Sequence, residues 1–297
     1  MTAGTTAILI EAEPRASRGL WRDALGRLRH NGPAMLGVVF ITIFVVTAIF
    51  APLIAPYDPS ASNLIQSKQP PSLAHPMGTD LLGRDEFSRV VYGARVSLTV
   101  GVVAVFFGLL LGTLMGAAAG GIGGKVDTVL MRVTDVMLAV PGILLAIGIV
   151  AMLGQGQIQI MLAVGIAYAP VFARLLRGSL LGLRESDFAL AARSEGAAPS
   201  RILTRHLLPN ALTPLIVAAT LALATAIIDV AGLGFLGLGP GDPRIPEWGE
   251  MLTDSARFLQ SAAWLILFPG LAIVISAVGF NLLGDGLRES IDPRLKR

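Results

Sequence analysis

Residues 185–210, ESDFALAARSEGAAPSRILTRHLLPN, form a polar interruption between two long apolar segments. Ser186 can cap a short helix over residues 188–193, and Gly196 tolerates the left-handed turn that ends such a helix. Pro199 suits the first turn of a second helix, because its fixed φ is already helical. The stretch therefore predicts two short crossed helices with small residues on one face, which form a projection to which another protein can bind.

The second of these helices would present two chemically different sides. Its apolar side consists of Ile202, Leu203 and Leu207. Its polar side offers hydrogen-bond donors to a partner: Arg201, Arg205 and His206. We interpret His206 as a surface donor rather than a general base, because the sequence gathers no Ser/His/Asp set around it. The segment predicts a docking surface and no catalytic residue.

The composition places most of this chain in a lipid bilayer. The chain has 297 residues, of which 54% are hydrophobic and 14% charged, and its mean hydropathy is +0.71. One soluble domain cannot bury that much apolar surface. The pI of about 9.7 does not indicate nucleic acid as a partner, because Lys and Arg flank apolar runs instead of pooling in one polar segment. The absence of Cys excludes disulfides, thiolate metal sites and a Cys nucleophile.

Six apolar segments are long enough to cross the hydrocarbon layer as helices. They cover residues 34–55, 96–124, 128–153, 158–176, 212–230 and 258–284. The sequence thus predicts an all-α integral membrane protein with six transmembrane helices. It divides into a tail over 1–33, a first transmembrane helix and outer loop over 34–95, a transmembrane core over 96–285 and a tail over 286–297. Residues 78–92 are predicted to form an interfacial helix, and 231–257 a Gly/Pro-rich connection.

The basic residues indicate how the chain is oriented. With both termini inside, 17 of the 23 Lys and Arg residues fall on the cytoplasmic side and 6 on the outside. This distribution satisfies the positive-inside rule, which the reversed orientation would violate. The loop 185–210 is therefore expected in the cytoplasm.

A stripe of glycines runs along the second predicted span. Gly108, Gly112, Gly116 and Gly120 recur every four residues, which lets helix backbones approach closely. We interpret the stripe as a packing surface, against another helix of this chain or a sister subunit, in preference to a substrate path.

Two charges lie near the start of the third predicted span. Arg132 and Asp135 are one helical turn apart, and charges at membrane depth are costly unless they are paired. We expect an intramembrane ion pair between them, or side chains that extend to the interface, in preference to a role in translocation.

Several motifs suggest chemistry that their context does not support. Residues 232–237 match G-x-G-x-x-G, but a membrane span precedes them instead of the strand that a dinucleotide-binding unit needs. Gly124 and Lys125 lack the first Gly and the hydroxyl of a phosphate-binding loop. The three His residues are scattered along the chain, so the sequence predicts no metal site.

The loop 185–210 resembles the cytoplasmic coupling loop of bacterial ABC importer permeases. The pattern of that family is Glu-Ala-Ala, three residues, Gly, nine residues, Ile, any residue, Leu-Pro. Here Ala191, Ala192 and Gly196 are in register, and Leu208-Pro209 closes the motif. The ending RHLLPN, residues 205–210, is typical of the dipeptide, oligopeptide and nickel group. Leu190 stands in the place of the usual Glu, and His206 in that of the Ile.

Further blocks extend the resemblance over nearly the whole chain. They are HPMGTDLLGRDEFSRVVYGAR, DTVLMRVTDVMLAVPGILLAI, FLGLG with PEWGEML, and the terminal DPRLK. This chain departs from the group at Val230, where a Glu is frequent and Asp229 lies beside it, and at Gly232 and Gly234, where Ser is usual. We expect either that Asp229 takes the role of this Glu, one residue earlier, or that the outer mouth of the path is less rigid.

The resemblance implies a type I ABC importer permease fold in a bacterial inner membrane. It implies a second homologous permease, two ABC ATPase subunits that bind ATP and Mg²⁺, and an extracytoplasmic solute-binding protein docked on residues 57–95 and 239–257, where Trp248 lies. No cofactor binds this chain itself. The contact with the ATPases is assigned to Leu190, Ala191, Ala192, Gly196, Arg201, Arg205, His206, Pro209 and Asn210.

Other classes and substrates remain as alternatives. A secondary transporter or channel would need ionisable residues near the bilayer centre, and an intramembrane enzyme would need a catalytic constellation at one depth. Neither is evident in the sequence. Di- and oligopeptides are the first expectation for the substrate, with nickel chelates, glutathione or oligosaccharides as alternatives.

Overall fold

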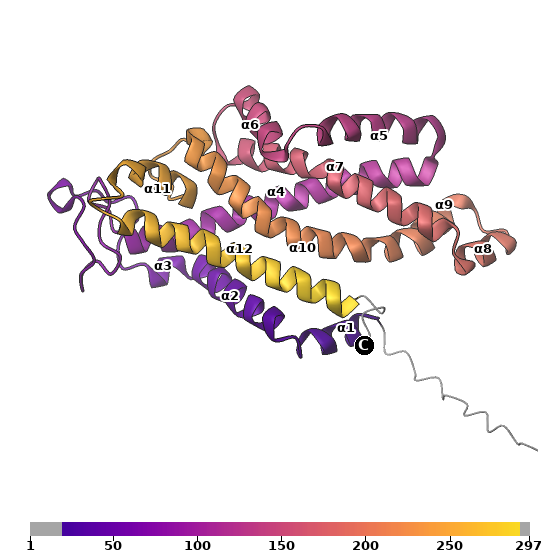
Figure 1. Cartoon of the computed structure of the whole chain (residues 1–297), viewed down its shortest axis with the longest axis horizontal. Coiled ribbons are helices and arrows are strands. Elements are labelled where there is room, and N and C mark those ends of the chain that lie inside the picture. Colours follow the sequence, from indigo (N-terminus) through magenta and orange to yellow (C-terminus); the bar gives the residue numbers. More distant parts are fainter. Residues whose placement is uncertain (1–19, 292–297) are drawn as a thin grey trace, which may run out of the picture.

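The structure, a computed structural model, describes residues 20–291. These residues fold into an elongated bundle of helices (Figure 1), and their only β-type pairing is an isolated bridge between Thr79 and Asp85. Five helices are long and apolar enough to cross a membrane, and a sixth crossing exists if one bent helix pair counts as a single span. The predicted all-α membrane fold is therefore confirmed.

The α-helices of the described residues follow one another along the chain. They are α1 (Leu20–Leu28), α2 (Gly32–Ile49), α3 (Ala51–Ile54), α4 (Glu86–Ile122), α5 (Gly124–Leu138), α6 (Gly142–Leu153), α7 (Gln157–Arg184), α8 (Asp187–Ser194), α9 (Pro199–Ile202), α10 (Leu208–Leu233), α11 (Trp248–Ser255) and α12 (Trp264–Ile291). The membrane-length helices are α2, α4, α7, α10 and α12.

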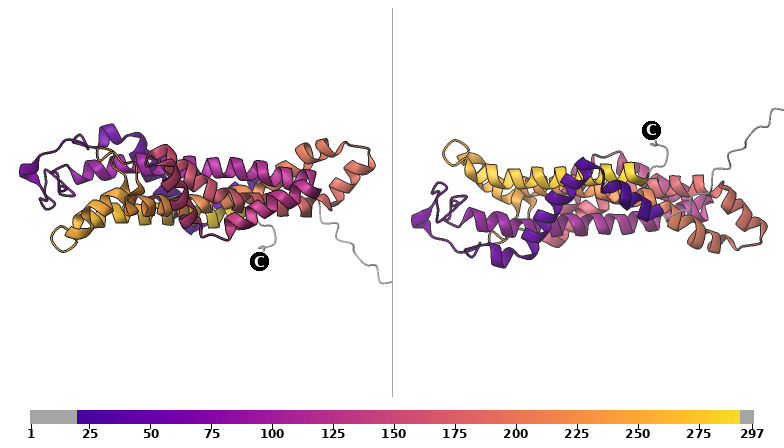
Figure 2. Two further views of the ribbon diagram at one scale, coloured as in Figure 1. Left: turned by 90° about the horizontal axis from the view of Figure 1, so that it is seen from above. Right: turned by 90° about the horizontal axis from the view of Figure 1, so that it is seen from below.

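The bundle has two distinct ends (Figure 2). The loop over residues 56–85 and helix α11 lie at one end, which we call the cap end. Helices α8 and α9, which we call the helical pair, project from the opposite end. Both α1 and the last turn of α12 lie toward the end of the helical pair (Figure 1), where the Arg27 guanidinium donates to the Ser290 carbonyl at 3.1 Å.

Helices α4 and α7 run parallel and in close backbone contact. A Cβ atom added to Gly108, Gly112 or Gly116 of α4 would lie only 2.6, 2.5 or 2.6 Å from the carbonyl oxygens of Gly165, Ala169 and Ala173 of α7, respectively. Farther along, Gly120 faces the Leu180 side chain, with a separation of 3.0 Å for such an atom. The glycine stripe thus packs against a helix of this same chain, at a separation that only small residues permit.

A second layer of the bundle is formed by α2, α12 and α10. Gly37 of α2 lies against the backbone of Gly279 of α12, where an added Cβ would be 2.6 Å from the carbonyl oxygen. The Leu221 side chain of α10 packs directly on Gly284 of α12, where an added Cβ would be 2.5 Å from Leu221 Cδ2. Small residues therefore set the helix separation in both layers.

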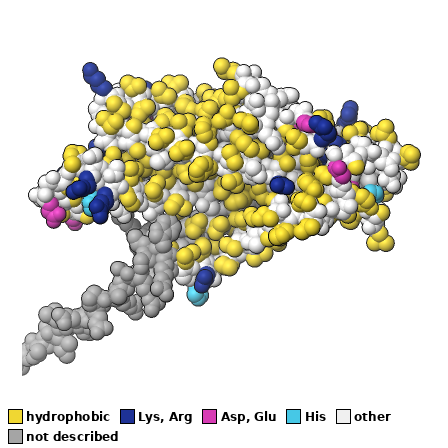
Figure 3. All heavy atoms as spheres, turned by 180° about the vertical axis from the view of Figure 1, so that it is seen from behind, with side chains coloured by type: hydrophobic (Ala, Val, Ile, Leu, Met, Phe, Trp, Pro, Cys, Tyr) yellow, Lys and Arg dark blue, Asp and Glu magenta, His cyan; other side chains and the backbone are white. Residues whose placement is uncertain are grey.

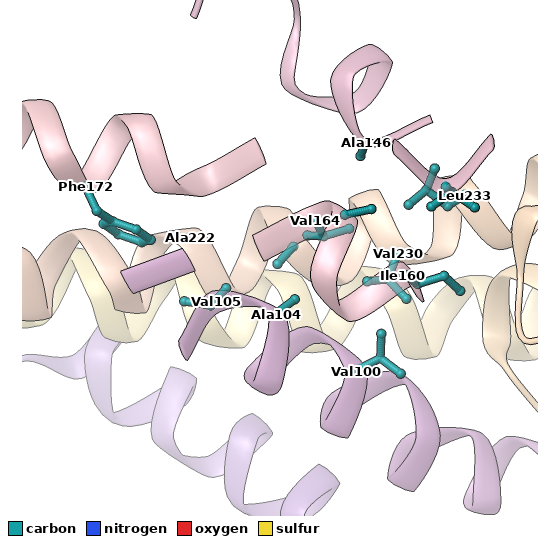
Figure 4. Packing of buried hydrophobic residues seen from close by; sticks show 13 residues of the cluster. Val100, Ala104, Val105, Ala146, Ile160, Val164, Phe172, Ala222, Val230 and Leu233 are labelled. Carbon is teal, nitrogen blue, oxygen red and sulfur yellow. The ribbon is translucent and has the colours of Figure 1, made fainter. Parts of the chain in front are cut away.

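The largest buried cluster lies between α4, α6, α7 and α10 (Figure 4). Its labelled members are Val100, Ala104, Val105, Ala146, Ile160, Val164, Phe172, Ala222, Val230 and Leu233. On the outside, apolar side chains cover the middle of the bundle on the face drawn in Figure 3, and charged side chains gather toward its two ends. Such a distribution suits a surface that faces lipid.

Three predicted boundaries are corrected by the structure. The third predicted span is broken at residues 139–141, and α5 and α6 meet at 95°. Of the interfacial helix expected over 78–92, residues 78–85 are loop, and only 86–92 are helical, as the start of the continuous 37-residue helix α4, which Asp85 caps by accepting from the Ser88 N–H at 2.7 Å. The last span begins at Trp264 instead of residue 258.

The close contact between α4 and α7 predicts that Gly112→Ala destabilises the protein. The added methyl group would meet the Ala169 carbonyl at 2.5 Å, and overpacking of this kind costs about 1–3 kcal/mol. Thermal unfolding in detergent should show a lower midpoint. The matched control is Gly178→Ala on α7, where an added Cβ meets nothing within 4 Å. Equal midpoints for the two variants would contradict the close contact.

Candidate functional site

The helical pair begins where α7 ends. Ser186 occupies the N-cap position of α8, as predicted, but its hydroxyl donates to the Leu183 carbonyl at 2.6 Å instead of accepting from the first turn. Asp187 lies in the first turn of α8 and Arg193 in the last. These charges complement the helix dipole, so the short helix is supported by electrostatics where the cap bond is missing.

Gly196 ends α8 in the left-handed conformation that the sequence predicts. Its φ is +79°, and its N–H donates to the Arg193 carbonyl at 2.9 Å. The Ala197 N–H then donates to the Ala192 carbonyl at 3.0 Å, which completes the helix end. An added Cβ at Gly196 would meet no atom within 4 Å, so this position faces open space.

The second helix of the pair is not a separate element. Helix α9 passes through a π-helical turn, Leu203–Leu207, directly into α10. Pro209 explains the π turn, because its ring lacks an N–H and would clash with the carbonyl four residues earlier in a regular α-helix. The Asn210 side-chain amide donates to the His206 carbonyl at 2.6 Å in the same turn. A displacement at α9 is therefore transmitted to α10 through continuous helix.

The apolar side of the helical pair is fixed to the bundle. Ala189 of α8, Ile202 of α9 and Leu207 are 0%, 3% and 2% exposed, and they pack against Leu176 and Leu180 of α7. Leu203 is partly buried on the same cluster. The predicted apolar side thus anchors the pair instead of facing a partner.

The outer side of the pair carries most of the residues that the sequence assigned to docking. On the pair itself Leu190, Ala191, Gly196 and Arg201 are exposed, and Ala192 is half-buried. In the π turn and the start of α10 that follow it, Arg205, Pro209 and Asn210 are exposed, and His206 is half-buried. Leu190 is 48% exposed. A partner would therefore meet an apolar side chain where the related motif has a carboxylate.

A cavity of about 500 Å³ lies between the helical pair and the ends of α4 and α7. Its lining includes Arg184, Arg193, Ile122 and Leu203. The Arg184 guanidinium also donates to the Gly121 carbonyl, which ties the end of α7 to the end of α4. The base of the pair is thus braced against both helices of the parallel contact.

The charges of α5 pair with α7 and not with each other. Asp135 forms an ion pair with Arg174, so the predicted Arg132–Asp135 pair is wrong. Asp127, two turns earlier, accepts from the Arg177 Nη2 at 2.7 Å. The reason is geometric: α5 lies along α7, which places Asp127 and Asp135 within reach of Arg177 and Arg174.

A buried charge cluster at the cap end was not anticipated from the sequence. Asp80, Arg84 and Arg89 are 6%, 4% and 3% exposed. Asp80 accepts from the Arg84 backbone N–H at 2.9 Å, and the Arg89 Nε lies 3.5 Å from Asp80 Oδ2. The Arg84 Nη1 donates to the Pro243 carbonyl at 2.7 Å, which links the two loops of the cap. The signal for this cluster in the sequence is the spacing of Asp80 and Arg84, which are four residues apart in GTDLLGRDEF.

Trp248 belongs to the interior of the cap. It is fully buried, and its indole N–H donates to the Val90 carbonyl at 3.1 Å. The expectation that it contributes to an outer docking surface is therefore wrong. Glu247 caps α11 beside it, accepting from the Gly249 and Glu250 N–H groups at 2.9 Å each, while the Ser97 hydroxyl donates to it at 3.3 Å.

The departures from the related motif near residue 230 have structural counterparts. Val230 is 1% exposed in the main core, so no carboxylate is needed there. Asp229 instead accepts from the Tyr168 hydroxyl at 2.8 Å. Gly234 lies against the Glu247 carboxylate, and an added Cβ would collide with Oε2. Glycine therefore leaves room for the buried carboxylate.

The described residues contain no group of three or more His, Asp or Glu side chains that could hold a metal ion. His75 contacts Asp85 at 2.8 Å within the cap, and His206 lies at the helical pair. The structure therefore places these two histidines at opposite ends of the bundle (Figure 1).

Two protein families match this sequence. The family described as the inner membrane component of binding-protein-dependent transport systems matches residues 108–297. The N-terminal transmembrane domain of oligopeptide transport permease C matches residues 19–71. Together the two matches cover the helical pair, the parallel α4–α7 contact and the first membrane helix.

Similar curated proteins cover nearly the full length. The chain is 48% identical to a dipeptide transport system permease protein of Alkalihalophilus pseudofirmus, over 93% of this chain and 90% of that protein. It is 40% identical to an oligopeptide transport system permease protein of Bacillus subtilis, over 95% and 92%. It is 45% identical to a glutathione transport system permease protein of Escherichia coli, over 96% and 94%.

A solved structure shares the fold. A chain of the MetNI methionine ABC transporter, in an inward-facing conformation, superposes with a TM-score of 0.58 at 22% identity, covering 69% of this chain and 96% of that chain. The likeness extends the sequence matches to the arrangement of helices.

The buried carboxylate of Glu247 predicts a pH-dependent cap. Burial raises the pKa of Glu247 to about 7 from an ordinary value of 4.5. The folded state therefore keeps a proton that the unfolded state releases, and the free energy of unfolding falls as the pH rises through this window. In the Glu247→Gln variant, the free energy of unfolding should fall less between about pH 5 and pH 8 than it does in the wild type, by at most about 3 kcal/mol.

Thermal unfolding in detergent across this pH range measures the effect. Glu185→Gln, at an exposed position, is the matched control and should follow the wild-type profile. A Glu247→Gln profile with the wild-type slope would contradict the assignment.

Proposed function

This chain belongs to the inner-membrane permeases of binding-protein-dependent ABC importers, and we propose that it forms half of a translocation path for di- and oligopeptides. It is a multi-pass membrane subunit that performs no covalent chemistry, and it works with ATPase and binding-protein partners. In this proposal a second, homologous permease supplies the other half of the path. ATP and Mg²⁺ bind to two partner ATPases and not to this chain.

The observation that carries the proposal is the form of the helical pair. Its inner side is anchored by Ile202 and Leu207, while its outer side presents Ala191, Gly196 and exposed arginines at the tip of the bundle. Small side chains allow a partner to seat closely, and continuity with α10 transmits a rigid-body shift. Closure of the ATPases on ATP binding would move the pair and switch the access of the path between the two sides of the membrane.

The orientation follows from the same reasoning. The helical pair must face the cytoplasm, where nucleotide is available. Helix α1 and the end of α12 lie toward the same end (Figure 1), so we place both termini in the cytoplasm of a bacterial cell and the chain in its inner membrane. The cap then faces outward to the binding protein.

The cap offers an apolar tip for that contact. Leu64, Ile65 and Leu73 are 70%, 91% and 105% exposed there. Beneath them, the buried Asp80–Arg84 pair and the bond from Arg84 to Pro243 hold the two loops together. A rigid base under exposed apolar residues suits a docking surface for a soluble partner.

The dipeptide and oligopeptide permeases among the relatives support peptides as the substrates of this chain. The glutathione permease at 45% identity supports glutathione as the second candidate. Nickel chelates and oligosaccharides remain alternatives from the sequence resemblance. Selection among them depends on the binding protein.

Co-expression with the neighbouring genes of the same operon tests the function. The chain should co-purify with two ATPase subunits and a second permease, and ATPase activity in lipid should rise when peptide-loaded binding protein is added. Stimulation by loaded binding protein with glutathione alone would move the substrate to glutathione. Purification without an ATPase partner would overturn the proposal.

Blocking the helical pair should abolish transport without preventing insertion. Gly196→Trp places a large side chain in open space on the docking side, where it would obstruct the ATPase groove. Gly154→Trp is the matched control, because Gly154 also has a positive φ, +87°, and open space around it, but lies at the other end of α7. ATP-driven uptake should be lost in the first variant only, and normal uptake by an inserted Gly196→Trp protein would contradict the docking role.

A further inference from the structure

A polar cluster lies on α7 and α10, away from the helical pair and the cap. The Tyr168 hydroxyl is 2.8 Å from the Thr225 hydroxyl and 2.8 Å from Asp229 Oδ2. Tyr168 and Asp229 are half-buried, and Thr225 is exposed. Neither the packing of the bundle nor the docking of the ATPases accounts for a carboxylate at this position.

The cluster lies deep in the membrane-spanning part of the chain. Tyr168 is about 16 Å from the first residue of the 28-residue helix α7 and about 24 Å from its last, at the helical rise per residue. Its Cβ also lies next to Gly108, within the apolar body of α4. The sequence placed Asp229 at the edge of a predicted span, whereas the structure brings it against the middle of α7.

A carboxylate at such depth must face water or a polar partner. Exposure of a charged side chain to lipid costs on the order of 3 kcal/mol or more at the centre of a bilayer. Helix α10 nevertheless leaves Thr225 exposed and Asp229 half-exposed, one turn apart on one face. A Cβ added to Gly232, the next residue on this face, would meet only the tip of Ile143, at 3.4 Å, so this face of α10 is loosely packed one turn beyond the carboxylate.

The hydrogen bonds of the cluster leave one oxygen free. A phenol has one proton, and an ionised carboxylate only accepts. Tyr168 therefore donates to Asp229. The single proton of the Thr225 hydroxyl is donated to the Ala222 carbonyl at 3.1 Å, and its oxygen lies 2.8 Å from the phenol oxygen. Among the residues that the structure describes, no donor reaches Asp229 Oδ1. The cluster thus presents a fixed carboxylate with one free acceptor, which matches a cationic donor.

We propose that Asp229, held in place by Tyr168, binds the α-ammonium group of a peptide as it passes through the membrane. The proposal rests on the proposed function and names the substrate group that this chain recognises. A free α-ammonium group is shared by all unmodified di- and oligopeptides, so one carboxylate can serve peptides of different side chains. Tyr168 is a positioning residue in this arrangement.

The first test measures uptake by proteoliposomes that contain the complete complex and saturating binding protein loaded with dialanine. Asp229→Asn should lower maximal uptake at least about tenfold, the effect of losing a hydrogen bond to a charged group. The concentration of loaded binding protein that gives half-maximal uptake should not change, because the binding protein docks at the cap. ATPase stimulation should persist, so fewer peptides enter per ATP.

Conservative variants separate charge from structure. Asp229→Glu should restore at least about half of the wild-type uptake, because the charge remains. Tyr168→Phe should have an intermediate effect. The matched control is Asp285→Asn, an exposed carboxylate on α12, which should transport like wild type.

A second measurement addresses the ligand group directly. Saturation-transfer NMR of the assembled complex in nanodiscs, without binding protein, compares dialanine with N-acetyl-dialanine. The wild type should contact dialanine, and Asp229→Asn should lose this signal, while the acetylated peptide should give the same weak signal with both proteins. Equal dialanine signals for the two proteins would overturn the proposal.

The outcomes separate this proposal from the function on which it rests. If the wild-type complex takes up no peptide, the proposed function and the ammonium site are both overturned. Wild-type uptake with an equally active Asp229→Asn variant would overturn only the site. Failure of Asp229→Asn to assemble with the second permease would also overturn it, because Asp229 would then be a subunit contact.

Discussion

The close contact between α4 and α7 is the constraint on which the rest of the structure depends. Three glycines of α4 lie against carbonyl oxygens of α7, so the two helices run side by side at a separation that only small residues permit. Lipid provides no hydrophobic driving force between helices, so this packing carries the association. It fixes the register of α7 against α4, and hence where the helical pair and Tyr168 lie relative to α4.

The same contact gives the chain a continuous mechanical route. Arg184 ties the end of α7 to α4 beneath the helical pair, and Asp127 and Asp135 of α5 hold α7 from its other side. From the pair, α9 continues through the π turn into α10, which carries Asp229. In the proposed function, an ATPase docked on the pair would act on a helix that reaches the polar cluster, while the buried charges of the cap link the loops at the opposite end.

The sequence predicted those features that depend on local chemistry. Gly196 ends α8 with a positive φ, Pro199 begins α9, and the apolar lengths of the spans follow from the hydrocarbon thickness. It could not predict contacts between distant helices. Asp135 pairs with Arg174 because α5 folds back along α7, and Trp248 is buried because α11 packs against α4 and α12. Asp229 was assigned to the edge of a span because hydropathy does not report which helix faces it. The roles of the helical-pair residues in docking remain predictions.

The central claim is that the helical pair and α10 move as one rigid unit when ATP binds. The chain contains no Cys, so spin labels at Ser200→Cys on α9 and Ile228→Cys on α10 can be introduced without background. Pulsed electron spin resonance would measure the distance between them in the assembled complex, without nucleotide and with ATP trapped. The account predicts an unchanged distance within this chain, and a changed distance between Ile228→Cys and a label on the second permease. A change of more than about 2 Å within the chain, with a hinge at Leu203–Leu207, would contradict it.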